Sequence, residues 1–361
     1  MSTLIVEVCA IEEIAPHPNA DRLEQARTKN WWVIVPKDQY KVNDKIVYFP
    51  PDSIITEELA AQHGITKYCV PITVDDVQHY RIKAQRLRGL PSYGYVTNPD
   101  NPEWEVGTNV QEHYKVTKYE PIIHPGDGDT APAHPAFTHY TDIENIGNYP
   151  GILQLGEPII IQEKIHGTNI RIGLILAPNP ETGVAEYRIM CGSHTQNRKQ
   201  YDKNNQSSKY WQASTENTRA LLNNLCRNQN NVILYGELYG PGIQDMTYGV
   251  STQQVRYYDI TVNNKYLNHD ETIYLFNNYR IETPPTLYSG PYDDSVIRQY
   301  TDGPTTIAPQ SIIKCKFKGR EGVVIRPAVE RYSPLLPGSG RVIFKSISAD
   351  YLDRKNATDY Q

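Results

Sequence analysis

The sequence predicts an α+β protein of two domains, a β-rich barrel followed by a larger mixed domain. The chain has 361 residues, which is too long for one small core and suits two domains of ordinary size. Short apolar runs separated by turn residues dominate up to about residue 118, whereas strands alternate with a few helical stretches after about residue 137. We therefore expect a first domain at 1–118, a linker at 119–136 and a second domain at 137–361.

The first domain is predicted from four apolar runs, which read LIVEVCAI, WWVIVP, KIVYFP and SYGYVT. Several short strands at close spacing are typical of a small barrel. Trp31 and Trp32 are neighbours in one run. Because neighbouring side chains of a strand face opposite ways, we expect one of the two rings to be buried and the other exposed.

The linker and two helices are predicted from local composition. Pro, Gly, Asp and Ala interrupt any periodicity between residues 119 and 136, which disfavours a packed element. A helix is expected to start near Thr141 or Asp142, with Asp142 or Asn145 as its cap, and a second helix is expected at 214–228.

Composition and charge exclude several classes of protein. The net charge is −5, so any contact with nucleic acid must come from a local patch. The five cysteines are odd in number and lack C-x-x-C spacing, which argues against a disulfide framework and a structural zinc site. No apolar run reaches about 18 residues and no signal peptide is readable. We expect an intracellular, cytoplasmic monomer that contacts no membrane.

One stretch supplies a local basic patch. In IIKCKFKGRE the cations alternate, so on a strand they would project to one side; they are Lys314, Lys316, Lys318 and Arg320. Such a row is either a charged edge strand that resists sheet-to-sheet pairing or a phosphate-binding face. With Arg326, which follows in the next strand, these residues are the candidates for nucleic-acid binding.

The stretch PIIIQEKIHGTN, residues 158–169, carries the first candidate chemistry. It is predicted to be a buried strand that ends at Lys164, followed by a tight turn in which Gly167 takes a positive φ or lets a ligand approach the backbone. Partial burial or a second cation would raise the population of free amine, the form of lysine that attacks phosphate or carbonyl groups.

Four later stretches strengthen that interpretation. Each of them brings a polar side chain to the end of an apolar strand: Glu237 in YGELYG, Asp259 in VRYYDI, Glu321 in KGREGVVIRP and Lys345 in RVIFKSIS. Each one alone is explained by a strand and a turn. Their order and residue types together indicate a shared function.

The set resembles the covalent nucleotidyltransferase superfamily of ligases and capping enzymes, whose hallmark is K-x-D/H-G. The form EKIHGTN is similar to that of RNA ligases typified by the second RNA ligase of phage T4, and FTHYTDIENI resembles the opening segment of their catalytic domain. The resemblance covers residues 137–350. It implies an antiparallel-sheet-rich, ATP-grasp-like ligase domain with the nucleotide between two sheets.

The N-terminal region resembles a different module. Chiefly through PHPNADRLE, residues 1–118 are similar to the tRNA-binding OB-like module of some aminoacyl-tRNA synthetases. The two parts together resemble the two-domain RNA ligases of Deinococcus and Naegleria. The resemblance implies a nucleic-acid-binding OB-like β-barrel, in which aromatic rings such as those of Trp31 and Trp32 serve as stacking platforms.

The resemblance also implies roles for residues. Lys164 would be the nucleophile that forms lysyl-AMP from ATP, and His166 and Asp259 would assist catalysis. The nucleotide would be contacted by Glu163, Lys164, Asn169, Arg198, Glu237, Tyr258 and Lys345. Glu237 and Glu321 would hold Mg²⁺ or Mn²⁺, which prefer oxygen ligands.

One position departs from the family pattern. The family has two lysines one residue apart in the last motif, whereas Ile347 stands here at the second position. Either this chain uses Lys345 alone, or Lys355 or Arg326 supplies the second cation.

The expected function is ATP-dependent joining of a 3′-OH RNA end to a 5′-phosphate in RNA or an RNA-containing duplex. A DNA ligase or a capping-type nucleotidyltransferase is the nearest alternative, although the histidine of EKIHGTN speaks against it. A non-catalytic RNA-binding protein, working through its N-terminal module, is the alternative from another class.

Overall fold

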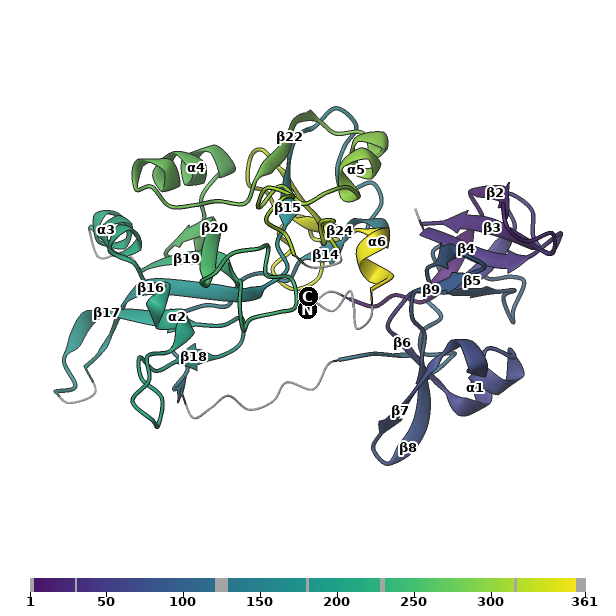
Figure 1. The fold of residues 1–361 in the computed structure, drawn as a ribbon, viewed down its shortest axis with the longest axis horizontal. Coiled ribbons are helices and arrows are strands. Elements are labelled where there is room, and N and C mark those ends of the chain that lie inside the picture. Colours follow the sequence, from purple (N-terminus) through teal and green to yellow (C-terminus); the bar gives the residue numbers. More distant parts are fainter. Residues whose placement is uncertain are drawn as a thin grey trace. The chain divides into compact units, whose positions relative to one another are not determined.

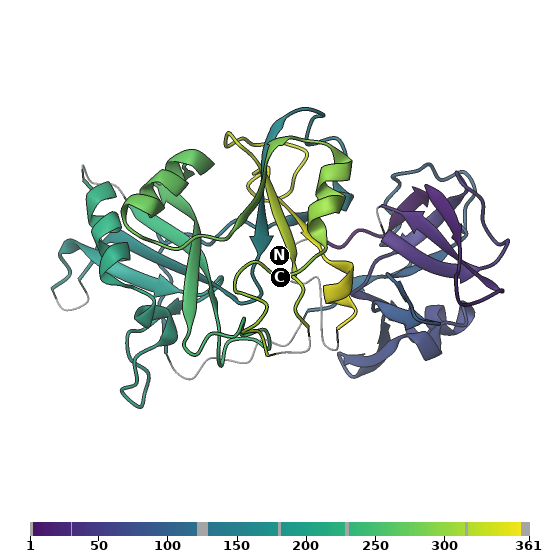
Figure 2. The same cartoon turned by 45° about the horizontal axis from the view of Figure 1, so that its top comes forward.

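The computed structural model describes residues 3–29, 31–120, 129–179, 182–227, 231–314 and 317–354. Its contacts divide the chain into two compact units (Figures 1 and 2). The first unit comprises the described parts of Met1–Ile122, Ile143–Pro150 and Ile347–Gln361, and the second comprises those of Ile123–Asp142 and Gly151–Ser346. Two short segments, 143–150 and 347–354, group with the first unit although they lie within the range 137–361 predicted for the second domain.

The first unit is built from short antiparallel strands, as its apolar runs predict. One sheet has the order β1 (Glu7–Ala10), β5 (Lys45–Phe49), β11 (Tyr95–Thr97), and a second has the order β2 (Glu13–Pro16), β3 (Leu23–Thr28), β4 (Trp31–Pro36). The others are β6 (Ser53–Thr56), β7 (Val70–Val74), β8 (Val77–Arg81), β9 (Gln85–Leu87), β10 (Leu90–Ser92), β12 (Thr117–Lys118) and β14 (Glu144–Asn145), with helices α1 (Glu57–Gln62) and α6 (Ala349–Leu352).

The PHPNADRLE segment and the two neighbouring tryptophans both belong to this unit. In the PHPNADRLE segment, buried His17 lies with Nε2 3.0 Å from the carbonyl of Leu87, and its Nδ1 accepts from the amide of Asn19 at 3.1 Å. This segment is therefore a packed turn. Trp31 and Trp32 are both half-buried, which corrects the expected division into one buried and one exposed ring. They begin β4, which lies at the edge of its sheet.

The second unit contains two sheets, whose registered pairs are antiparallel. The larger has the order β13 (Thr130–Ala131), β18 (Asn197–Arg198), β17 (Ala185–Gly192), β16 (Thr168–Pro178), β19 (Val232–Tyr239), β20 (Gln254–Val262), β21 (Lys265–Tyr266). The smaller contains, in order, β24 (Phe344–Ile347), β23 (Gly322–Pro327), β15 (Pro158–Lys164) and β22 (Thr286–Pro291). Strand β13 falls inside the predicted linker, so that part of the linker is a paired strand, whereas residues 121–128 lie outside the described part.

The helices of the second unit are α2 (Lys209–Gln212), α3 (Glu216–Leu225), α4 (His269–Asn278) and α5 (Asp294–Thr301). Helix α3 confirms the helix predicted at 214–228, and the Thr215 hydroxyl caps it by accepting from the amide of Thr218. Together α3 and α4 pack their apolar side chains onto the larger sheet (Figure 1). Among the described residues, no helix is long and apolar enough to cross a bilayer.

The helix predicted to start near Thr141 or Asp142 is wrong. Only a 3-10 turn forms, η2 (Ile146–Asn148), and Asn145 caps it by accepting from the amide of Gly147 at 3.0 Å. Gly147 has low helix propensity and Pro150 cannot continue a helix, so the turn ends at once.

Strand β15 positions the lysine of interest. Ile159, Ile160 and Ile161 are buried, and β15 is held between β22 and β23, so its last residue, Lys164, is placed by a rigid strand. A turn at 165–167 then leads into β16 of the larger sheet. Gly167 does not have a positive φ, so the first of its two predicted roles is wrong, and the approach of a ligand to its backbone stays a prediction. The glycine is needed because a Cβ there would lie 2.3 Å from the carbonyl oxygen of Leu238.

Candidate active site

Four side chains converge where β15 ends, and we call Lys164, His166, Glu237 and Glu321 the lysine pocket. The ammonium of Lys164 donates to Oε1 of Glu321 at 2.7 Å. The two meet because Lys164 pairs with Gly322 across β15 and β23, and Glu321 immediately precedes that glycine. Burial raises the pKa of Glu321, but the charges of Lys164 and His166 outweigh it and hold this pKa at about 2.

Glu237 brings a second carboxylate to the lysine pocket from the larger sheet. It lies on β19, opposite Asn169 of β16. Burial and the negative charge of Glu321 raise its pKa to about 8, although Lys164 and the amide of Gly167 oppose this shift. Glu237 therefore binds a proton more readily than an exposed glutamate does, chiefly because it is buried.

These carboxylates meet the requirements of a hard divalent cation. Oε2 of Glu321 is buried and accepts no hydrogen bond, since Nδ1 of His166 lies 3.7 Å away. Among the described residues no group of three or more His, Cys, Asp and Glu side chains could hold a metal. Mg²⁺ is commonly held by one or two carboxylates together with waters and substrate phosphates, so a pair of carboxylates fits it, whereas a zinc cage is not formed.

His166 is oriented by two residues that the sequence did not suggest. Its Nε2 donates to Oδ1 of Asp245 at 2.9 Å, and its backbone amide donates to the hydroxyl of Tyr248 at 2.7 Å. Both partners belong to the stretch GPGIQDMTYG that follows β19. A carboxylate on one imidazole nitrogen fixes the tautomer and the ring orientation.

Glu163, the residue before Lys164, forms its hydrogen bonds with two threonines outside the lysine pocket. Its carboxylate accepts from the hydroxyl of Thr305, and from the amide and hydroxyl of Thr306 at 2.7 and 2.6 Å. Neither threonine was suggested by the sequence. The structure thus orients Glu163, whereas its contact with a nucleotide stays a prediction.

Tyr258 and Asn169 are brought together across the larger sheet. The side-chain amide of Asn169 donates to the hydroxyl of Tyr258 at 2.6 Å. The β19–β20 register shifts by one residue after Tyr235, so Tyr258 has no partner across the strands. Such a bulge re-aims a side chain, and bulges are frequent beside active sites.

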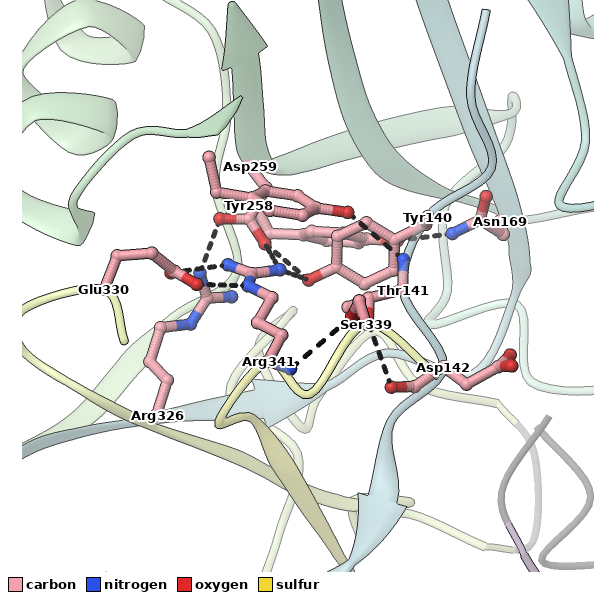
Figure 3. Close-up of polar contacts among 11 residues, drawn as sticks. Tyr140, Thr141, Asp142, Asn169, Tyr258, Asp259, Arg326, Glu330, Ser339 and Arg341 are labelled. Atoms are coloured by element: carbon pink, nitrogen blue, oxygen red, sulfur yellow. Dashed lines mark hydrogen bonds and ion pairs between the residues drawn. The ribbon is translucent and has the colours of Figure 1, made fainter. Parts of the chain in front are cut away.

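Asp259 lies in a separate cluster, which we call the Asp259 network and which consists of Tyr140, Asp259, Arg326, Glu330 and Arg341 (Figure 3). Arg326 donates to Oδ1 of Asp259 at 2.6 Å, Arg341 donates to Oδ2 at 3.0 Å, and the hydroxyl of Tyr140 also donates to Oδ2. Asp259 is fully buried and both its oxygens accept hydrogen bonds within the chain, so the structure shows it as the centre of an ion-pair network, and its assistance to catalysis stays a prediction.

The remaining predicted phosphate contacts separate into two groups. Lys345 is completely buried on β24, two strands from β15 across β23. Arg198 lies on β18 of the larger sheet, next to the edge strand β13, and forms an ion pair with Asp129 at 2.5 Å. Arg326 is committed to the Asp259 network, so it does not supply the second cation missing at Ile347, and Lys355 lies outside the described residues.

The predicted basic strand is also corrected. Residues 314 and 317–320 belong to no named strand. Arg320 is buried and donates to the carbonyls of Tyr300 and Pro304, each at 2.9 Å. Lys314 and Lys318 are exposed and remain candidates for nucleic-acid binding, while Lys316 lies outside the described residues.

Comparisons with known proteins find relatives of both parts of the chain. A family model described as RNA ligase matches residues 157–347, and one described as an OB-fold domain matches residues 5–99. No curated protein matches significantly in sequence.

Solved structures provide full-length matches. A mutant of Naegleria gruberi RNA ligase with ATP and Mn is 22% identical with a TM-score of 0.73, and covers 98% of this chain and 100% of its own. A mutant with AMP and Mn is 23% identical with a TM-score of 0.72, covering 97% of this chain and 98% of its own. An apo mutant of the same protein is 23% identical with a TM-score of 0.71, covering 98% of each chain. These likenesses extend over both units and establish the fold.

Proposed function

Because the chain belongs to the RNA ligase family, we propose that it is an ATP-dependent RNA ligase that joins a 3′-OH RNA end to a 5′-phosphate, with a nicked duplex as substrate. The observation that carries the proposal is the lysine pocket, where the Lys164 ammonium lies 2.7 Å from Glu321 and burial raises the pKa of a second carboxyl group, that of Glu237. The Naegleria gruberi ligase with ATP and Mn supports the choice of nucleotide and metal.

The first step is attack of Lys164 on ATP. The neutral Nζ attacks the α-phosphorus, an N–P bond forms, the bond between the α-phosphorus and the bridging oxygen breaks, and pyrophosphate leaves with the electron pair. The ion pair with Glu321 favours the ammonium form of Lys164, so this pair must separate and the proton must leave to solvent before attack.

In the second step an oxygen of the RNA 5′-phosphate attacks the same phosphorus, which restores the lysine amine. In the third step the 3′-hydroxyl oxygen attacks the activated 5′-phosphorus, and AMP leaves. His166, oriented by Asp245, is the residue we assign to assist these strand-joining steps. Asn169 and Tyr258 are assigned to the ribose and the adenine, respectively.

Glu237 and Glu321 are the residues that would hold Mg²⁺ or Mn²⁺. When bound there, the cation would neutralise phosphate charge and favour the neutral form of the nearby lysine. Lys345 is assigned to the α-phosphate.

An adenylation assay tests the proposal. The full chain incubated with ATP labelled at the α-phosphate and Mg²⁺ or Mn²⁺ is expected to form an acid-labile covalent adenylate, which Lys164→Ala abolishes. Lys265→Ala, which removes an exposed lysine of the same unit, is the control and should label normally. Absence of an adenylate with either metal would refute the proposal.

Two further measurements separate the alternatives. Excess unlabelled GTP should not reduce labelling, whereas a capping-type enzyme would be inhibited. Sealing of matched nicks with RNA or DNA on each side of the break should require an RNA 3′-OH end; equal sealing with DNA there would identify a DNA ligase. A non-catalytic RNA-binding protein would bind the nick without forming an adenylate.

A further inference from the structure

The first unit contains a cavity of about 340 Å³, and no residue of the lysine pocket lines it. Most protein interiors are packed without voids of this size, and binding pockets begin at roughly 300 Å³. Its wall is apolar and aromatic, and includes Val33, Val35, Tyr40, Ile65, Ile82, Tyr95 and Val96. The lining therefore suits a flat, largely apolar body.

A cation without a counter-ion lines the same cavity. Lys83 is half-buried, and its ammonium has no hydrogen bond or ion pair within the described part of the chain. Burial and the neighbouring charge of Arg81 lower the pKa of Lys83, with Asp52 opposing them in part. Leaving a partly buried ammonium unpaired is unfavourable, so an anion bound in the cavity would stabilise this arrangement.

His63 adds a second unsatisfied polar group to the lining. Its Nε2 is buried and has no hydrogen-bond partner. Burial lowers the pKa of His63, although Asp100 opposes this shift, and in the neutral ring Nε2 donates or accepts according to its tautomer. The ring also packs edge-on against Tyr95 at 5.7 Å, which holds it at the wall.

From these observations we propose that this cavity binds a nucleotide, with the base against the aromatic and apolar wall, the base edge on Nε2 of His63 and the phosphate on Lys83. A planar heterocycle joined to a phosphate satisfies all three features, whereas an aliphatic anion would leave His63 unpaired. An unpaired nucleotide of the RNA substrate and a free mononucleotide share this chemistry. The RNA source rests on the proposed ligase function.

The test compares RNA binding by the full chain, measured by fluorescence anisotropy with a duplex carrying a short single-stranded 3′ extension and with the same duplex blunt-ended. Lys83→Ala is expected to weaken binding of the extended duplex about tenfold and to lower the magnitude of its salt slope by about 0.7. Binding of the blunt duplex should not change. Cys69→Phe, which fills the cavity and retains Lys83, should weaken binding of the extended duplex similarly.

Lys37→Ala is the matched control, because Lys37 is exposed and lies outside the lining. Thermal unfolding first establishes that each variant is folded. The proposal is overturned if folded Lys83→Ala and Cys69→Phe bind the extended duplex as the unmodified chain does, or if Lys37→Ala loses as much affinity.

Competition with AMP and UMP distinguishes the two sources. If AMP or UMP displaces the RNA from the unmodified chain but not from Lys83→Ala, a free mononucleotide is a ligand of the cavity. If neither displaces the RNA, while Lys83→Ala still weakens binding of the extended duplex, the RNA strand is the ligand. The adenylation of Lys164 is measured separately and is expected to be unchanged in Lys83→Ala. A chain that never forms the adenylate but loses RNA affinity in this variant would refute the ligase proposal and support the cavity.

Discussion

The lysine pocket and the Asp259 network both bury charged side chains in the second unit, but they differ in how completely the charges are paired. Both oxygens of Asp259 accept from Arg326, Arg341 or Tyr140, and the two arginines outweigh burial and lower its pKa. In the lysine pocket, one oxygen of Glu321 has no hydrogen bond and Glu237 has a pKa of about 8.

The difference indicates what each cluster is for. A buried carboxylate whose oxygens are all paired within the chain has nothing left to offer a ligand, and its removal leaves cations unpaired. A cluster with an open oxygen and a raised pKa is incomplete until a cation or substrate arrives.

Asp259→Ala should be more destabilising than Glu321→Gln. It leaves Arg326 buried without its carboxylate and Arg341 paired with Glu330 alone, so the free energy of unfolding is expected to fall by about 3–5 kcal/mol. Denaturant unfolding measures this. The contrast fails if the loss is no larger than that for Glu321→Gln, or if Asp259→Ala remains fully stable and only adenylation is lost.

Glu321→Gln should have the opposite profile. It keeps the shape of the side chain but removes the charge that pairs with Lys164 and would hold the metal, so adenylation should fall about 100-fold or more. The loss of stability should be smaller than for Asp259→Ala. Single-turnover adenylation and unfolding are measured on the same preparation, and normal adenylation in this variant would exclude Glu321 from the reaction.

Asp245→Asn should have a moderate effect on the strand-joining steps. Its side chain is 64% exposed, so the lost charge-assisted hydrogen bond to His166 is partly screened, and about a tenfold decrease or less is expected. Sealing of pre-adenylated RNA should slow, while formation of lysyl-AMP changes little. If both steps slow equally, Asp245 acts on the whole pocket and not through His166.

The last effect is a pH dependence of stability caused by Glu237. Its pKa is about 8 when folded against a reference value of 4.5, so between these values the unfolded state holds fewer protons and stability falls as pH rises. In metal-free buffer the free energy of unfolding should therefore fall steadily between about pH 5 and pH 8, relative to Glu237→Gln, and the melting temperature should fall with it. Glu321, with a lowered pKa, contributes stability that is lost only below about pH 4.5. Parallel profiles for the two proteins would contradict the raised pKa.

Parts of the fold and site follow from local sequence because their causes are local. The isoleucines of β15 and the Thr215 cap of α3 act on neighbouring residues, so the strand and the helix were predictable. Local sequence was misleading at 314–320. The alternating cations suggested a strand with one basic face, whereas Arg320 is buried and donates to the carbonyls of Tyr300 and Pro304, which are distant in sequence.

Partners far apart in the chain could not be predicted. Asp245 lies 79 residues from His166, and Thr305 lies 142 residues from Glu163. Asp259 meets Arg326 and Arg341 across 67 and 82 residues. No local pattern reports such pairs, because they depend on which strands become neighbours in the two sheets.

The sequence by itself determined which residues are candidates for the chemistry: a lysine at the end of a buried strand, followed in order by two glutamates and a second lysine. The tertiary structure decided which carboxylates have all their oxygens hydrogen-bonded within the chain and which do not. Charge pairing acts over a few ångströms in space, and only the folded sheets set those distances. For that reason Glu237 and Glu321 can receive a ligand, whereas Asp259, equally prominent in the sequence, is enclosed by two arginines.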